Sequence, residues 1–155
     1  MIQRIQSVYL SLVVLLSILI LNGSYLTFTD TNRSVFGITL RGLFRSTDGI
    51  GNELIAKLLP VSALMILIPL LALVTILLFK NRKIQMLFTT IEIILSVVLI
   101  LLSVYYSYIV ISRYDTSIVA GFKMVIPVVI LILSILAYRG IRKDDNLVKS
   151  YDRLR

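Results

Sequence analysis

Long apolar runs separated by more polar links dominate the chain. The runs cover residues 8–21, 58–79, 84–112 and 124–138, and charged side chains are nearly absent from them. A helix rises about 1.5 Å per residue and the hydrocarbon core of a bilayer is about 30 Å thick, so about 20 residues span it. The second and third runs reach that length alone, whereas the first and fourth need flanking residues. Because lipid cannot satisfy a free backbone, all four are predicted to be transmembrane helices.

The first run also has the length of the apolar region of a signal peptide. Its basic flank contains only Arg4, and the best cleavage position, after Gly23, would put Leu21 where a small residue is expected. A retained helix is therefore the preferred interpretation.

The link between the first two runs has the pattern of a β-hairpin. Residues 25–29 and 36–40 alternate between apolar and polar, and residues 30–33 between them favour a turn. A lone hairpin is marginal in water, so we expect it to pack on the helix ends or on a partner protein. Asn52 is a suitable N-cap for the second helix, which is predicted to begin at about residue 53.

Composition supports the membrane class and removes much chemistry. The chain is 58% hydrophobic and 15% charged, with a mean hydropathy of +0.97, against about 45–50% and about 25% in soluble domains. It contains no cysteine and no histidine. Disulfides, thiolate or imidazole metal sites and the usual neutral-pH general base are therefore excluded. No catalytic residue, cofactor or metal is predicted, and we expect the protein not to be an enzyme.

The positive charges predict the orientation. On one side of the four runs lie ten lysines and arginines, close to the helix ends: Arg4, Lys80, Arg82, Lys83, Arg139, Arg142, Lys143, Lys149, Arg153 and Arg155. On the other side lie six: Arg33, Arg41, Arg45, Lys57, Arg113 and Lys123. Cytoplasmic loops carry the excess, so both termini are predicted to be cytoplasmic.

The predicted fold is an all-α membrane protein. It is a four-transmembrane-helix bundle with a small extracytoplasmic β-hairpin between helices one and two and a basic amphipathic C-terminal helix. Residues 1–155 form a single integral membrane domain with helices at about 5–23, 53–79, 84–112 and 120–140, an outer loop at 24–52 and a cytoplasmic tail at 141–155.

Glu92 is the only acid inside an apolar run. A charge at a helix centre costs on the order of 2.5–3.5 kcal/mol, so Glu92 should be protonated, paired, or turned toward protein or water. Polar residues at helical spacings predict that it faces the interior, and they form a candidate intramembrane site: Gln85, Thr89, Glu92 and Ser96. Candidate partners on the other helices are Ser11, Ser17, Thr75, Arg4 and Arg139. Two interpretations stay open: a packing contact, or a site for proton- or cation-coupled translocation.

The C-terminal tail is basic with one apolar face. It is typical of a helix lying on an anionic membrane surface, or of a docking surface for a partner. Three aspartates, Asp144, Asp145 and Asp152, interrupt its positive charge, which disfavours a nucleic-acid partner.

Three segments carry a resemblance to a known family. The N-terminal MIQRIQSVYL, the FKNRKIQ of the second link and the tail RGIRKDDNLVKSYDRLR resemble a bacterial family of small four-helix inner-membrane proteins described as a domain of unknown function. The resemblance implies a bacterial inner membrane and four helices, but no activity or cofactor. The matching motifs, with Arg142 from the tail, supply a candidate cytoplasmic interaction surface, where the first helix and the tail are expected to clasp each other: Gln3, Arg4, Gln6, Arg142, Lys143, Asp144, Asp145, Lys149, Asp152 and Arg153.

Two functions follow from the sequence. The first is an accessory or assembly subunit of a membrane protein complex. Such a subunit would contact lipid and other membrane proteins, and the sequence is compatible with an oligomer. The alternative is a small proton- or cation-coupled transporter or channel that uses Glu92.

Overall fold

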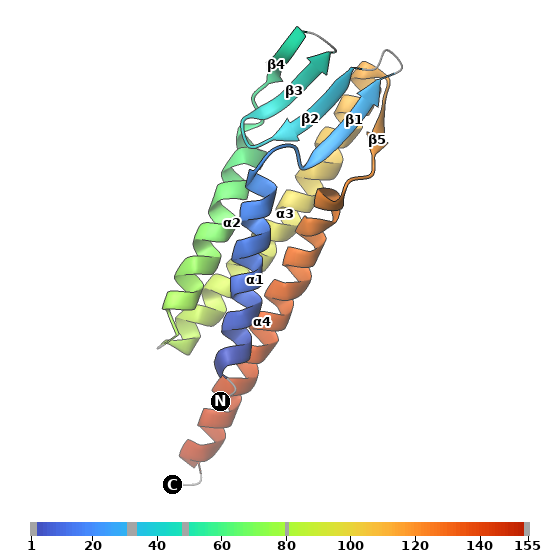
Figure 1. The fold of residues 1–155 in the computed structure, drawn as a ribbon. Coiled ribbons are helices and arrows are strands. Elements are labelled where there is room, and N and C mark those ends of the chain that lie inside the picture. Colours follow the sequence, from blue (N-terminus) through green and yellow to red (C-terminus); the bar gives the residue numbers. More distant parts are fainter. Residues whose placement is uncertain (1–2, 31–33, 48–49, 80, 154–155) are drawn as a thin grey trace.

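The structure is a bundle of helices capped at one end by a β-sheet (Figure 1). This computed structural model describes residues 3–30, 34–47, 50–79 and 81–153, with side chains described for 5–30, 34–46, 53–79 and 81–147. Within these ranges lie four helices, α1 (Gln3–Leu21), α2 (Leu59–Leu77), α3 (Arg82–Tyr114) and α4 (Phe122–Arg153). They form a ring in which α1 and α3 each pack between α2 and α4.

The prediction of an all-α fold is wrong, because the cap is an antiparallel sheet. Its strands are β1 (Leu26–Asp30), β2 (Val35–Thr39), β3 (Gly42–Thr47), β4 (Ile50–Ala56) and β5 (Thr116–Val119). The order across the sheet is β4-β3-β2-β1-β5. The predicted hairpin is present as β1 and β2, with Phe28 opposite Phe36, but it forms the inner part of a sheet of five strands.

Two local features explain why strands continue where a loop and a helix start were expected. The turn between β2 and β3 is only two residues long, and Gly42 closes it with a φ of 133°. A Cβ on Gly42 would lie 2.2 Å from the Ala56 carbonyl oxygen, so β3 and β4 approach closely only because this residue is glycine. Helix α2 begins at Leu59 because Pro60 suits a first helical turn. Asn52 therefore lies in β4, and the N-cap residue of α2 is Leu58.

The fifth strand comes from the link between α3 and α4. Asp115 ends α3 with a φ of 49°, and the chain then pairs with β1, Phe28 lying opposite Ile118. The sheet is thus tied to both halves of the bundle. Its inner face is buried, with Phe28, Phe36, Ile38 and Leu43 at most 5% exposed.

Aromatic side chains join this sheet to α3. The Phe36 and Tyr114 ring centroids lie 4.9 Å apart, and the Tyr25 hydroxyl lies 2.8 Å from Ser103 Oγ. Burial raises the pKa of the Tyr25 phenol above its ordinary value of 10.0, although the hydrogen bond to Ser103 acts in the opposite direction. This phenol therefore stays neutral, and able to donate, throughout the physiological range.

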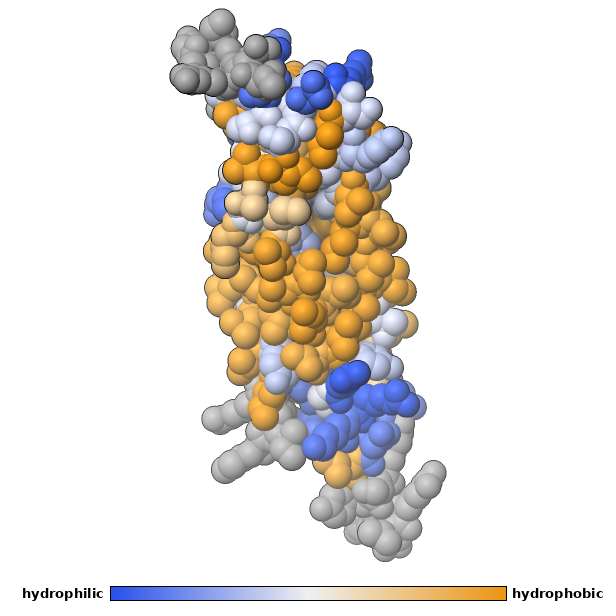
Figure 2. Space-filling model, turned by 90° about the vertical axis from the view of Figure 1, so that its right-hand side faces the viewer, coloured by the Kyte–Doolittle hydropathy of each residue, from blue (hydrophilic) through white to orange (hydrophobic). Residues whose placement is uncertain are grey.

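On the face shown in Figure 2, apolar side chains form a wide belt over the helices, with polar side chains at both ends. Of the described helices, α2, α3 and the part of α4 from Phe122 to Leu147 are long and apolar enough to cross a membrane. The described part of α1, Ile5–Leu21, is apolar but shorter. These three helices are compatible with a membrane protein, and a fourth span stays a prediction.

The tail is helical, as predicted, but it continues α4 and does not form a helix of its own. Helix α4 runs without a break from Phe122 to Arg153. Ile141 and Asp144 lie within this continuation and are 0% and 5% exposed. Burial of these two side chains against the bundle keeps the helix on the same axis, so α4 runs straight on past residue 140 (Figure 1).

Candidate functional site

Helix α3 carries a stripe of buried polar side chains. Gln85, Thr89, Glu92 and Ser96 recur at spacings of three and four residues, which place them on one face of the helix. All four are at most 4% exposed. The sequence therefore predicted the orientation of this stripe correctly.

Most of the stripe satisfies its hydrogen bonds locally. Thr89 Oγ1 donates to the Gln85 carbonyl oxygen at 2.8 Å, and Ser96 Oγ donates to the Glu92 carbonyl oxygen at 2.9 Å. Gln85 reaches a second helix, since its Nε2 donates to the Thr75 carbonyl oxygen of α2 at 3.2 Å. These residues need no ligand to be stable inside the bundle.

Glu92 is different, because it depends on a residue of α4. It is 0% exposed, and Ser134 Oγ donates to its Oε1 at 2.9 Å. The same hydroxyl lies 2.9 Å from the Ile130 carbonyl oxygen. A hydroxyl has one proton, so Ser134 donates to only one of these two acceptors at a time. Both contacts can be hydrogen bonds at once only if the Glu92 carboxyl is protonated and donates to Ser134 Oγ. Glu92 Oε2 has no hydrogen-bond partner among the residues that the structure describes.

The interior near this level holds little space. A cavity of about 10 Å³ lies between the helices, with room for at most about one water. Its lining consists of Ser17, Ile20, Met65, Ile68, Leu99 and Ile130. Glu92 does not line it, so this cavity does not connect the carboxyl to either surface.

The second polar site joins α1 to α4 at the end of the bundle opposite the sheet. Gln6 Nε2 donates to Asp144 Oδ2, and both side chains are buried, at 6% and 5% exposure. Arg82, at the start of α3, donates to the Asp144 carbonyl oxygen at 2.7 Å. Gly140 allows the close approach, because a Cβ there would lie 2.9 Å from Gln6 Cγ. We call this set of four residues the α1–α4 clasp.

The structure brings together only part of the predicted cytoplasmic surface. Gln6 and Asp144 meet in the clasp, Arg142 and Lys143 are exposed, and Asp145 is half-buried. The remaining candidates have side chains outside the described residues: Gln3, Arg4, Lys149, Asp152 and Arg153.

Sequence reasoning missed Ser134 and Arg82 as partners. Ser134 carried a usable signal, since it is the only polar side chain in the apolar run of α4. Its distance from Glu92 along the chain, 42 residues, does not predict that the two side chains meet. Arg82 was interpreted only as a topology charge, and its contact is with a backbone oxygen, which sequence does not reveal.

The chemistry available to these sites is limited. Among the described residues, no group of three or more acidic, histidine or cysteine side chains is placed to hold a metal ion. Glu92 with Ser134 can hold one proton or one hydrogen bond between α3 and α4. The clasp can fix the relative positions of α1, α3 and α4 at the bundle end.

These observations define a helix bundle capped by an antiparallel sheet, with three helices that are compatible with a membrane protein and two buried polar contacts. The chain belongs to the family described as Domain of unknown function (DUF4293), whose sequence pattern matches residues 2–154. No curated protein and no solved structure matches the chain.

Proposed function

We propose that this protein is a non-enzymatic accessory or assembly subunit of a membrane protein complex. It would reside in a bacterial inner membrane with four spans and both termini in the cytoplasm. The start of α1 and the end of α4 lie at the same end of the bundle, opposite the sheet (Figure 1). The excess of lysine and arginine at that end supports its cytoplasmic placement.

The observation that carries this proposal is the continuation of α4 beyond the clasp. Asp144 is joined to α1 and α3, and the helix then extends to Arg153, beyond the other helices (Figure 1). An isolated helical segment of this length is marginal in water. It follows the direction of the bundle, so a flat membrane surface would not cover it. A partner that packs along it would stabilise it.

The exposed side of this continuation suggests the chemistry of that partner. An open hollow of about 460 Å³ is lined by Arg139, Arg142, Lys143, Asn146 and Leu147. Leu147 is 42% exposed, so the surface combines positive charge with an apolar contact. A membrane-bound partner with an acidic and partly apolar cytoplasmic surface would complement it.

The test is crosslinking in native membranes, with a photoreactive amino acid in place of Asn146. We expect one defined partner to be recovered, and we expect R142E/K143E to abolish the crosslink. K83E is the matched control, because Lys83 is an exposed charge at the start of α3, on the same end of the bundle. Recovery of the protein only as a lone monomer in several gentle detergents would refute the proposal.

A second candidate, the coupled transporter or channel, is favoured by one observation. Glu92 is fully buried in the apolar belt with one carboxyl oxygen that no described residue satisfies. In proteoliposomes, Glu92→Gln should abolish proton or cation flux while the protein still inserts and folds. T90A is the control, since Thr90 lies on the exposed side of the same helix and bonds to the Met86 carbonyl oxygen. Equal flux in wild type and Glu92→Gln, or none in wild type, would retire this candidate.

A further inference from the structure

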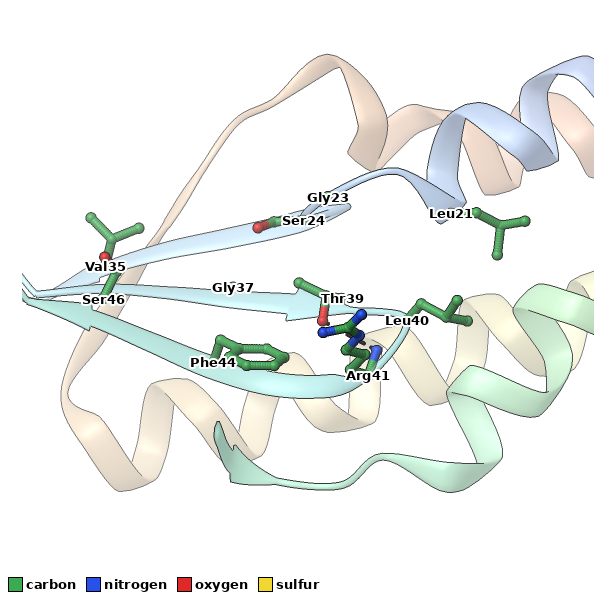
Figure 3. Close-up of a pocket in the computed structure, with 10 residues that line it drawn as sticks. All are labelled: Leu21, Gly23, Ser24, Val35, Gly37, Thr39, Leu40, Arg41, Phe44 and Ser46. Atoms are coloured by element: carbon green, nitrogen blue, oxygen red, sulfur yellow. Dashed lines mark hydrogen bonds between the residues drawn. The ribbon is translucent and has the colours of Figure 1, made fainter. Parts of the chain in front are cut away.

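The outer face of the sheet carries an open hollow next to the end of α1. Its volume is about 590 Å³, within the range of small-molecule sites. In Figure 3 it extends from Val35 and Ser46 at one end to Leu21 and Leu40 at the other. We propose that this hollow binds one anionic membrane phospholipid, with the phosphate on Arg41 and an acyl chain against Leu21 and Leu40. This inference rests on the proposed membrane placement and goes beyond the subunit role.

Arg41 supplies the positive charge. It is exposed at the two-residue turn between β2 and β3, and its guanidinium has no hydrogen-bond or ion-pair partner in the described part of the chain. Thr39 holds the turn, since its Oγ1 donates to the Gly42 carbonyl oxygen and accepts from Arg41 N. The guanidinium is therefore free on an ordered turn, and its planar donors suit two phosphate oxygens.

The strand that lines the middle of the hollow contains a residue without a side chain. Gly37 lies in the middle of β2, and a Cβ there would lie 2.6 Å from Ser24 Oγ. The Ser24 side chain therefore packs close to the β2 backbone at Gly37, and Ser24 and the Phe44 ring flank this position in the hollow (Figure 3). A ligand can lie on the strand backbone, with hydroxyl and aromatic groups beside it.

Position decides which occupant fits best. Leu21 is the last residue of α1, and Leu40 packs partly buried against the hydrophobic core. This end of the hollow thus lies where the apolar helix α1 ends and the sheet begins. A phospholipid presents its phosphate and its first methylene groups at that boundary. An extended peptide would match the sheet face but would not need a free cation beside an apolar end.

The experiment uses the full-length protein reconstituted with photoactivatable phosphatidylglycerol or photoactivatable phosphatidylcholine. Adducts are mapped by mass spectrometry to residues 21–46 and, as an internal reference, to residues 139–147. We expect the adducts on residues 21–46 to form more readily with phosphatidylglycerol. Arg41→Gln should weaken this labelling about fivefold, since one basic residue near an anionic surface contributes about 1 kcal/mol. Labelling of the reference segment should not change.

Lys57→Gln is the matched control, because Lys57 is an exposed cation at the same end of the bundle but does not line the hollow. It should leave the labelling of residues 21–46 unchanged. Ser46→Trp, which fills the far end of the hollow, should reduce it. Equal labelling by both lipids, or equal labelling of wild type and Arg41→Gln, would overturn the inference.

Two further outcomes would also overturn it while identifying another occupant. Competition by water-soluble glycerol phosphate would show that free phosphate is sufficient. A protein crosslinked at Ser46 in native membranes, without lipid adducts, would show a protein contact. The membrane placement itself is tested separately by alkaline extraction. If alkali releases the protein from membranes, the membrane placement is wrong. If the protein is retained but forms no lipid adducts, only the lipid site is wrong.

Discussion

Two buried polar contacts tie α4 to its neighbours, and they differ in how well they are satisfied. In the clasp, Asp144 accepts from the Gln6 amide, and its backbone oxygen accepts from Arg82. Inside the apolar belt, Glu92 accepts only from the Ser134 hydroxyl, and its second oxygen has no partner among the described residues. Both carboxyl groups are almost fully buried.

The difference follows from the position of each pair along the bundle. At the bundle end, the Gln6 amide donates to the Asp144 carboxylate, and the positive Arg82 guanidinium lies close by on the Asp144 backbone oxygen. In the apolar belt, an ionised carboxyl with one neutral donor is costly, because little else can screen it. The clasp is therefore suited to fixing helix positions, whereas the Glu92 pair is the more sensitive of the two to a change of charge.

The largest expected effect is at Glu92. Glu92→Arg places a permanent charge and extra volume at a fully buried position, and we expect it to lower the free energy of unfolding by about 3 kcal/mol or to prevent folding. Unfolding in mixed micelles and size-exclusion chromatography measure this. Glu92→Gln, of similar size and uncharged, should retain the fold. If the arginine variant were as stable and monodisperse as wild type, the carboxyl would not be confined as described.

Removing the acceptor of the clasp should have the next largest effect. Asp144→Ala leaves the buried Gln6 amide without its acceptor, which should lower the free energy of unfolding by about 1–3 kcal/mol. The same denaturation assay measures it. Asp144→Asn keeps a carbonyl acceptor and should cost less. Equal losses for both substitutions would mean that the amide bond is not what stabilises the clasp.

A smaller effect is expected when the donor to Glu92 is removed. Ser134→Ala should cost about 0.6 kcal/mol, the average for an interhelical hydrogen bond in a membrane protein. A double-mutant cycle with Glu92→Gln isolates the pair. Thr90→Ala is the control, since Thr90 is exposed and bonds to the Met86 carbonyl oxygen of its own helix. A coupling energy near zero would contradict a specific α3–α4 contact.

The smallest net effect concerns the close approach in the clasp. Gly140→Ala gains helix propensity of about 1 kcal/mol but presses a Cβ against Gln6, so the two effects should nearly cancel in wild type. In a Gln6→Ala background the contact is absent, and the full gain of about 1 kcal/mol should appear. The comparison of the two backgrounds in thermal unfolding is the measurement. Identical effects in both would show that Gly140 is not needed for the clasp.

The two contacts also differ in how far the sequence predicted them. The stripe on α3 was predicted from spacing, because a helix brings residues three and four apart onto one face. The contact of Gln6 with the tail followed from motifs at the two ends of the chain. Ser134 and Arg82 were not recognised as partners, since the packing of α3 against α4 and the reach of an arginine to a backbone oxygen depend on the folded arrangement.

The sheet shows the same limit more strongly. Alternation predicted β1 and β2, which pair through a short link. The pairing of β5 with β1 joins residues about ninety positions apart, and no local pattern sets that register. The hollow beside Arg41 also depends on the tertiary structure, because the sheet must lie at the end of α1 for Leu21 and Leu40 to line the same hollow.

By itself, the sequence determined the apolar helices, their polar ends and the inward face of α3, because these depend on hydrophobicity and on local periodicity. Only the tertiary structure decided that a five-stranded sheet caps one end of the bundle and that α4 extends past the other helices at the opposite end. It also decided which side chains meet Glu92 and Asp144. These features arise from contacts between segments far apart in the chain, whose free energy appears only when the segments are packed together.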